Sequence, residues 1–389
     1  LAVIGGIGLL AVFKYADFAI RTVNALCGLS LSLTGIALPI GISFFTFQGL
    51  SYVIDVYREP KMVSHSFKKV LLYIAFFPQL IAGPIVKYHD VEQEIDSRRT
   101  TPQETALGIR RFICGLSKKL LLSNALGQMA DTVFALPAGE IGMLAGWTGA
   151  ICYTLQIYFD FSGYSDMAIG IGEFFGITLP ENFDYPYLAC SIGEYWRRWH
   201  MSLSGWFRDY VYIPLGGSRC RLRRTCLNLL IVFTLTGLWH GAAWQYVVFG
   251  LLHGLILCAE RLGLRRALER LPRFFGHLYT VMVLWLTLVI FGAPGLKEGL
   301  AALWGIFTWQ SGAKGYTLAA FADAKLLLIL AVSFLLCGPL QTLRPKLKEA
   351  FYARKAPSLA GAAGLLVLLF FGLMRVTAGT YSAFIYFQF

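Results

Sequence analysis

The sequence has few charged residues for its length. Charged side chains make up 14% of the 389 residues and hydrophobic ones 57%, whereas soluble domains carry about 25% charged residues. This shortage excludes a soluble protein, because too little charge remains to cover a surface of this size. The apolar residues instead form runs that are long enough to cross about 30 Å of hydrocarbon as helices. These runs are residues 37–57, 70–86, 141–158, 244–259, 278–292, 325–340 and 359–374.

The chain also lacks the short motifs of several function classes. It has no metal-type CxxC pair among its eight scattered cysteines, no zinc motif and no nucleophile elbow. We therefore expect neither a metal site nor a disulfide framework. No linker, low-complexity tract or internal repeat divides the sequence, which predicts a single domain over residues 1–389. The first residue is not Met and lies inside an apolar stretch, so we expect further N-terminal helices before the numbered chain.

Positive charge is in excess, with a formal net charge of +12. In a soluble protein this excess would suggest a nucleic-acid partner. Here the basic residues cluster in short segments between nearly uncharged spans, which is the pattern of the positive-inside rule. We therefore expect no nucleic acid and place the basic clusters at the cytoplasmic face. The clusters are residues 58–69, 98–119, 197–224, 261–273 and 344–355.

The apolar runs predict an all-α polytopic membrane protein with about nine to eleven transmembrane helices. Several of these helices should be broken, because Pro39, Pro78 and Pro84 lie inside apolar runs and proline removes a backbone hydrogen bond. Such breaks persist in a membrane only where protein or a water-filled cavity satisfies the freed backbone groups. We therefore expect the chain to enclose an internal cavity.

Residues 182–224 form the most unusual segment, in which aromatic side chains are mixed densely with arginines. The segment is too polar to span a membrane and too aromatic for an ordinary solvated loop. Trp and Tyr favour the level of the lipid headgroups, and arginine side chains can extend to it. We therefore expect short interfacial or re-entrant helices in contact with membrane lipid, which end in a turn at residues 214–217.

His240 closes the apolar run 225–239, which follows a basic stretch. Sixteen residues of helix from Arg224 would carry His240 about 24 Å into the membrane. The next apolar run returns to another basic segment at Arg261, so the two runs predict a hairpin with His240 near its deep end. An ionisable residue at that depth is a functional candidate, and an imidazole suits general-base catalysis. The alternative is a structural histidine that joins two helices by hydrogen bonds.

The aromatic–arginine segment contains a second candidate, His200. It is either part of a headgroup anchor or a polar group at the cytoplasmic mouth of a cavity, where it would contact an anionic acyl donor. Arg197, Arg198 and Arg208 would suit the phosphates of such a donor, since guanidinium groups offer paired hydrogen-bond donors. His253, like the remaining histidines, shows no partner spacing, and we expect a core or surface role for it.

Two carboxylates, Asp160 and Asp166, follow the apolar run that ends at residue 158. Their spacing does not place them on one helical stripe unless the helix is broken. They would pair with arginines, line a polar cavity or coordinate a cation. We expect the pairing.

Four motifs resemble the membrane-bound O-acyltransferase family, and more closely its bacterial alginate O-acetyltransferase branch. They are FPQLIAGPI at residues 77–85, the long block 158–217, LWHG at residues 238–241 and FIYFQF at residues 384–389. The resemblance covers nearly the whole chain, and its most specific part is the block 196–214. The teichoic acid D-alanyl transfer protein has similar signatures.

The resemblance implies a helical bundle around a central tunnel that is narrowest at a family histidine, which corresponds to His240. The second family histidine corresponds to His200. Six further residues are expected to support the tunnel. They are Trp196, Trp199, Asn182, Asp160, Asp166 and Trp239.

The reaction implied by the resemblance moves an acetyl group from a cytoplasmic thioester, acetyl-CoA, to a hydroxyl reached from the far side of a bacterial inner membrane. No bound cofactor is expected. A periplasmic or extracellular acetyltransferase or carrier protein would receive the group and pass it to a polysaccharide such as alginate. Three alternatives stay open: teichoic-acid D-alanyl transfer, an ion path through Asp160, Asp166 and His240, and a non-catalytic scaffold for glycan export.

Overall fold

The computed structural model describes residues 1–81, 83–137, 140–308, 323–352, 357–379 and 384–385, with only the backbone at residues 347, 348, 350 and 352. Throughout these residues every regular element is a helix, as predicted. Residues 386–389 of the C-terminal motif, Ala82 of the FPQLIAGPI motif and residues 353–355 of the last basic cluster lie outside the described residues.

The N-terminal part of the chain consists of α1 (Ala2–Leu10), the π-turn η1 (Ala11–Tyr15), α2 (Ala16–Cys27), α3 (Ile42–Arg58), the 3₁₀ turn η2 (Pro60–Met62), α4 (Phe67–Ala75), α5 (Phe77–Leu80), α6 (Tyr88–Asp96), α7 (Pro102–Ser117), the π-turn η3 (Lys118–Ser123) and α8 (Asn124–Phe134). The central part consists of α9 (Met143–Phe174), η5 (Pro186–Leu188), α10 (Ile192–Arg198), α11 (Met201–Phe207), the π-turn η6 (Arg208–Tyr212) and α12 (Leu222–His240). The C-terminal part consists of α13 (Trp244–Ala259), the π-turn η7 (Glu260–Leu264), α14 (Arg265–Glu269), α15 (Arg273–Gly292), α16 (Leu296–Phe307), α18 (Ala324–Leu336), α19 (Pro339–Leu343), α20 (Pro345–Tyr352) and α21 (Leu359–Thr377).

Within the described residues, four helices are long and apolar enough to cross a membrane by themselves. Of the other apolar runs, residues 37–57, 70–86 and 325–340 fold into shorter helices, and residues 141–158 belong to α9, which also carries charged residues. A shorter apolar helix, Ala324–Leu336, accompanies them. The four spans are Ala2–Cys27, Trp244–Glu269, Arg273–Gly292 and Leu359–Thr377.

The predicted proline breaks are confirmed. The apolar run 70–86 folds as α4 and the single turn α5, which has Pro78 in its first turn, and Pro84 follows in an extended segment. Pro39 lies in the irregular segment before α3. Each proline therefore stands where no intrahelical bond is required from its nitrogen.

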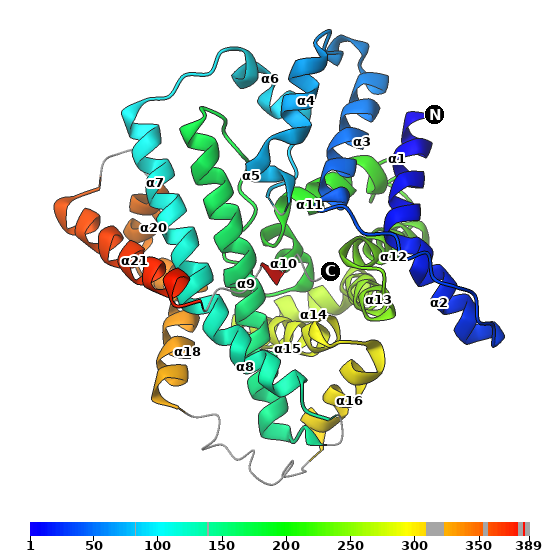
Figure 1. Ribbon diagram of the computed structural model, residues 1–389. Coiled ribbons are helices and arrows are strands. Elements are labelled where there is room, and N and C mark those ends of the chain that lie inside the picture. Colours follow the sequence, from blue (N-terminus) through cyan, green and yellow to red (C-terminus); the bar gives the residue numbers. More distant parts are fainter. Residues whose placement is uncertain (82, 138–139, 309–322, 353–356, 380–383, 386–389) are drawn as a thin grey trace.

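The long helix α9 runs through the middle of the molecule, with α7 and α8 beside it (Figure 1). On the other side of the view, α12 and α13 form an antiparallel hairpin next to α3 and α1. The two hairpin helices approach at glycines: a Cβ on Gly237 would lie 2.2 Å from the carbonyl oxygen of Tyr246, and one on Gly250 would lie 2.2 Å from that of Phe233. Small residues allow membrane helices to pack this closely.

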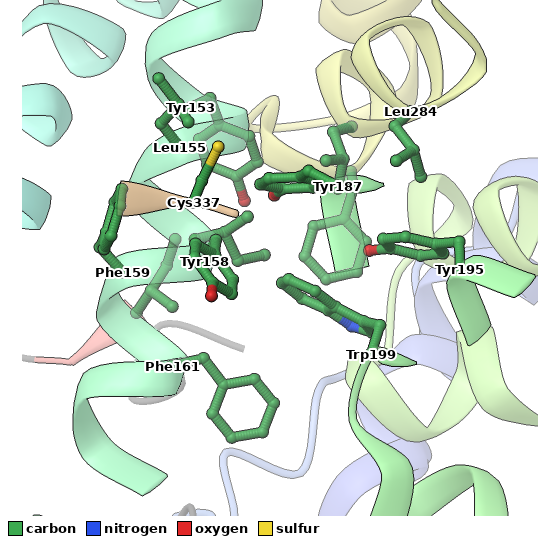
Figure 2. Packing of buried hydrophobic residues seen from close by; sticks show 14 of the residues in the cluster. Tyr153, Leu155, Tyr158, Phe159, Phe161, Tyr187, Tyr195, Trp199, Leu284 and Cys337 are labelled. Atoms are coloured by element: carbon green, nitrogen blue, oxygen red, sulfur yellow. The ribbon is translucent and has the colours of Figure 1, made fainter. Parts of the chain in front are cut away.

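An aromatic core joins α9 to the segment that precedes α11 (Figure 2). The ring of Trp199 stacks on Tyr195 at 5.5 Å and packs against Phe183 at 5.0 Å. Tyr187 anchors this layer to α9, because its hydroxyl donates to the carbonyl oxygen of Thr154 at 2.5 Å. The core fixes the segment that carries His200 against the centre of the bundle.

Candidate active site

His240 is the last residue of α12, and α13 begins four residues later at Trp244, so the predicted hairpin is present. The helix ends there because the backbone of Gly241 is extended. Position 241 has no room for a side chain, because a Cβ built there would lie 2.2 Å from the Tyr246 ring. His240 is 6% exposed. Its ring packs against Trp239 at 5.2 Å and against Phe291 at 5.1 Å.

One face of His240 opens on a cavity of about 180 Å³, which we call the histidine cavity. The cavity is also lined by Lys14, Ser43, Phe44 and Trp239. It therefore lies at the start of α3 and at the end of α12.

The opposite end of α3 carries basic residues. Arg58, the last residue of α3, donates to the carbonyl oxygen of Asp209 at 3.1 Å, and Lys87 forms a 2.5 Å ion pair with the Asp209 carboxylate. Partial burial acts to raise the pKa of Asp209, but the hydrogen bonds from Arg208 and Lys87 outweigh it and hold that pKa below its usual value. The basic cluster and the histidine cavity thus lie at opposite ends of α3.

His200 lies deeper than the sequence suggested, because it is completely buried. It connects α10 to α11 in the left-handed conformation (φ 43°), which is strained for a residue with a side chain. The turn is held by Asn182, whose carbonyl oxygen accepts from the Met201 nitrogen at 3.0 Å. The strain is therefore maintained by an irregular segment 18 residues earlier in the chain.

The side chain of Asn182 also orients the His200 ring. Asn182 Oδ1 accepts from the backbone nitrogen of Ser202 at 3.2 Å and from its hydroxyl at 3.0 Å, so this atom is the amide oxygen. His200 Nδ1 lies 3.1 Å from the same oxygen. Nδ1 must therefore carry the proton and donate it, which leaves the lone pair of a neutral ring on Nε2.

Trp239 lies between the two histidines. Its ring is 5.6 Å from the His200 ring and 5.2 Å from the His240 ring, and the two imidazoles are close enough to interact electrostatically. Phe161 of α9 closes the opposite side of His200 at 4.6 Å. The structure thus brings His240, His200, Asn182 and Trp239 into one buried cluster.

The short helix α10 is held at its first turn by two side chains. Ser191 Oγ accepts from the Glu194 nitrogen, and the Glu260 carboxylate accepts from the nitrogens of Ile192 and Gly193 at 2.6 and 3.0 Å. Acidic groups and hydroxyls stabilise a helix start in this way. Glu260 follows α13, so these bonds tie α10 to the hairpin that carries His240.

Trp196 of α10 is anchored by His253, for which a core or surface role was expected. The indole nitrogen of Trp196 donates to His253 Nδ1 at 3.1 Å, so His253 Nε2 carries the proton and donates to the hydroxyl of Thr287 at 3.1 Å. His253 is completely buried. It therefore has a structural role in the core.

A second cavity of about 500 Å³, the arginine cavity, extends along α12. The exposed Arg197 and Arg208 line it together with Trp196. The α12 residues that line this cavity all lie in a stripe on one face of the helix. His240 lies on the same face, one turn after the last of them. The residues of that stripe are Leu229, Val232, Phe233 and Thr236.

Arg198 differs from its neighbour Arg197. Its guanidinium forms ion pairs with Asp184 at 3.3 Å and with Glu194 at 2.9 Å, and it is absent from the lining of the arginine cavity. Of the three arginines considered from the sequence, only Arg197 and Arg208 line this cavity.

The two α9 carboxylates form buried ion pairs, as expected. Asp160 pairs at 2.5 Å with Lys119, a lysine where an arginine had been expected, and both side chains are 2% exposed. Asp166 binds Arg111 at 2.5 Å and Lys118 at 2.6 Å. The helix α9 is nevertheless unbroken. Within the described residues no group of three or more His, Cys, Asp or Glu side chains is arranged to hold a metal ion.

Asp166 and Asn182 line a third cavity of about 420 Å³, the α9 cavity, whose lining also includes apolar side chains of η3, α18 and α21. Its cation Lys118 is neutralised by Asp166, and the lining also includes the carboxylate of Glu181. Of the buried cluster of His240, His200, Asn182 and Trp239, only Asn182 lines this cavity.

The sequence analysis missed Lys14. Its side chain reaches the histidine cavity from the first membrane span, where it interacts electrostatically with His240. A signal was present, since Lys14 is the first charged residue of the chain and follows thirteen residues without charge. Intramembrane lysines are rare and mark functional positions.

The fold and this cluster define a polytopic membrane protein with two buried histidines between cavities. Residues 42–297 match the model of MBOAT, the membrane-bound O-acyltransferase family. The chain therefore belongs to this family and is a membrane acyltransferase.

Three relatives illustrate the family's range. The chain is 36% identical to a Pseudomonas aeruginosa protein named "Probable alginate O-acetylase AlgI", over 100% of this chain and 85% of the relative. It is 36% identical to the peptidoglycan O-acetyltransferase of Helicobacter pylori, over 79% of this chain and 64% of the relative. It is 31% identical to the teichoic acid D-alanyltransferase of Bacillus subtilis, over 56% of this chain and 58% of the relative.

Proposed function

We propose that residues 1–389 form one catalytic unit, a membrane O-acetyltransferase with His240 as its general base. The observation that carries this proposal is the position of His240. It lines the histidine cavity at the end of α12, and the α12 stripe of the arginine cavity leads to it from the basic end. Acetyl transfer is favoured over D-alanyl transfer because the relatives named for acetylation match more of the chain at higher identity.

The donor is acetyl-CoA, an anionic thioester, and its binding site is the arginine cavity. Arg197 and Arg208 are exposed at this cavity and suit phosphate groups. The α12 stripe from Leu229 to His240 spans eleven residues, or about 16 Å of helix. Arg208 is ion-paired with Asp209, but the described lining of the arginine cavity contains no carboxylate. The α9 cavity is a poorer site for an anion, since Asp166 and Glu181 both line it beside its lysine.

Transfer then proceeds at His240. The acceptor oxygen forms a bond to the thioester carbonyl carbon while its proton moves to His240, and the carbonyl π electrons move onto the carbonyl oxygen. Collapse of this intermediate restores the carbonyl group and breaks the C–S bond, and the leaving thiolate takes the proton from His240. A thioester is already activated, so the step needs no further reactant.

The acceptor hydroxyl reaches His240 through the histidine cavity. Because the basic cluster at the end of α3 marks the cytoplasmic side, this cavity faces the outside of a bacterial inner membrane. In the cell, a partner protein on that side, either an acetyltransferase or a carrier, takes the acetyl group and delivers it to a cell-surface polysaccharide. Because the transfer step requires only a hydroxyl at His240, a soluble oligosaccharide serves as the acceptor in an assay with purified protein. The relatives named for alginate and peptidoglycan acetylation support this class of final acceptor.

The buried ion pairs argue against the ion path considered from the sequence. Asp160 and Asp166 are both neutralised by bonded cations. Incubation of purified protein with labelled acetyl-CoA separates the alternatives: an acetyltransferase consumes the thioester in a reaction that depends on His240, whereas a transporter or a scaffold leaves it intact.

Replacing Arg208 with alanine should raise the KM for acetyl-CoA while kcat is largely kept. The reason is that a contact made equally in the ground state and the transition state contributes to binding alone. Arg197→Ala should act in the same direction. Steady-state kinetics with varied acetyl-CoA measure the effect. Arg198→Ala is the matched control, since this arginine is absent from the lining of the arginine cavity and should leave the donor KM near the wild-type value. An unchanged KM in Arg208→Ala and Arg197→Ala would remove the arginine cavity as the donor site.

His200→Ala should lower kcat and leave the donor KM nearly unchanged, which reverses the effect expected from sequence alone. His200 is buried beside Trp239 and His240 and is absent from the lining of the arginine cavity. Asn182→Ala should reproduce part of the loss, because it removes the oxygen that orients the His200 ring. If His200→Ala instead raised KM at constant kcat, the donor would have to contact His200 directly.

A further inference from the structure

Lys14 occupies an unusual place in the first membrane span, Ala2–Cys27. It lies within the π-turn η1, where the α-helical hydrogen-bond pattern is interrupted for five residues. Such π-turns are rare and are frequently found at functional sites. A lysine inside an apolar span is costly unless it has a specific partner.

Two side chains of this turn donate hydrogen bonds to carbonyl groups in the last turn of α12. Lys14 Nζ donates to the carbonyl oxygen of Trp239 at 2.6 Å and to Ser43 Oγ at 2.9 Å. The neighbouring Tyr15 hydroxyl donates to the carbonyl oxygen of Leu238 at 2.7 Å. Carbonyl groups in the last turn of a helix have no partner within that helix, so both side chains satisfy the end of α12 at His240.

Satisfying these carbonyls does not by itself require a charge, since the neutral Tyr15 hydroxyl serves one of them. The ammonium group of Lys14 has three protons, of which these two contacts use two. Lys14 and His240 line the same 180 Å³ cavity. The histidine cavity therefore combines a candidate base with a cation.

We propose that Lys14 is a further catalytic residue, which binds the oxyanion that forms on the acyl carbonyl during transfer. This inference rests on the proposed role of His240. As His240 accepts the hydroxyl proton, the carbonyl oxygen becomes negative, and Lys14 donates its third proton to it as a hydrogen bond. The ammonium stays protonated throughout, and the bond to the oxygen is lost when the intermediate collapses. A single donor of this kind contributes about 10²–10³-fold to kcat.

The test compares three variants by steady-state kinetics with labelled acetyl-CoA and an oligouronate acceptor. Lys14→Met keeps the length of the side chain but removes the charge, and we expect kcat to fall by about 10²–10³-fold with little change in the donor KM. Lys14→Arg keeps a cationic donor and should recover part of the rate. Tyr15→Phe removes the neighbouring bond to α12 and should lose far less activity than Lys14→Met.

Two results would overturn the assignment. If Lys14→Met and Tyr15→Phe lost similar activity in proportion to lost thermal stability, Lys14 would only complete the end of α12. If Lys14→Met raised the KM for the oligouronate at constant kcat and left a neutral cello-oligosaccharide unaffected, the lysine would bind a carboxylate of the acceptor. His240→Ala is assayed in parallel: an inactive His240→Ala beside a fully active Lys14→Met contradicts only the role of Lys14, whereas an active His240→Ala contradicts the proposed function itself.

Discussion

Replacing His240 with alanine should lower kcat for acetyl transfer by at least about 10²–10⁴-fold, the usual contribution of a general base. The variant should still fold, because the hairpin is fixed by its glycine contacts and by Gly241 rather than by the imidazole. The measurement is the initial rate of label transfer from acetyl-CoA by purified protein.

The matched control is His65→Ala. His65 is an exposed histidine that precedes α4, and its loss should leave the rate unchanged. A gel-filtration profile of His240→Ala that matches the wild type excludes misfolding as the cause of the loss. A variant that kept more than about a tenth of the wild-type rate would show that another group accepts the proton.

The second large effect concerns stability. Asp160→Ala removes the partner of Lys119 and leaves an ammonium group that is 2% exposed without its carboxylate. Breaking a buried ion pair from one side costs about 3–5 kcal/mol. Asp160 also accepts from Ser123 Oγ at 3.2 Å and from the backbone nitrogen of Ile385 at 2.9 Å, so the same change removes the acceptor of both bonds. Thermal unfolding in detergent should show a marked fall in midpoint.

Two further variants separate the charge effect from a general loss of packing. The double variant Asp160→Ala with Lys119→Met removes both charges and should recover part of the lost stability. Arg265→Ala breaks an exposed ion pair with Glu269 and should leave the midpoint nearly unchanged. A midpoint of Asp160→Ala equal to that of the wild type would mean that the Lys119–Asp160 pair adds no net stability.

The predictions that succeeded rest on local patterns. The α12–α13 hairpin with His240 at its end follows from two apolar runs, the basic residues that flank them and one glycine. The short helices of residues 192–212 follow from the mixture of aromatic residues and arginines, and the turn after them lies where it was expected. Each of these features is determined within fewer than forty consecutive residues of the chain.

The features that were missed depend on contacts between distant segments. Lys14 meets Trp239 across 225 residues, and Tyr15 meets Leu238 across 223 residues. Hydrophobic periodicity carries no information on such pairs, because it reports only which face of an element is apolar.

The π-turns were a second obstacle. Three of them carry basic side chains that were discussed above. The turn η1 contains Lys14, η3 contains Lys118 and Lys119, and η6 contains Arg208. A π-turn changes the rotation between successive residues, so a stripe drawn with the α-helical period assigns these side chains to the wrong face. Lys119, the partner of Asp160, lies in such a turn.

The central claim is that an acetyl group enters from the basic end of α12 and leaves through the histidine cavity, passing His240. Reconstitution in proteoliposomes of uniform orientation tests it directly, with labelled acetyl-CoA supplied on one side and an oligouronate acceptor on the other. We predict acceptor labelling when the donor is on the side of Arg208 and Arg58, little labelling when donor and acceptor are exchanged, and none in His240→Ala. Equal labelling from both sides, or labelling that persists in His240→Ala, would contradict transfer across this site.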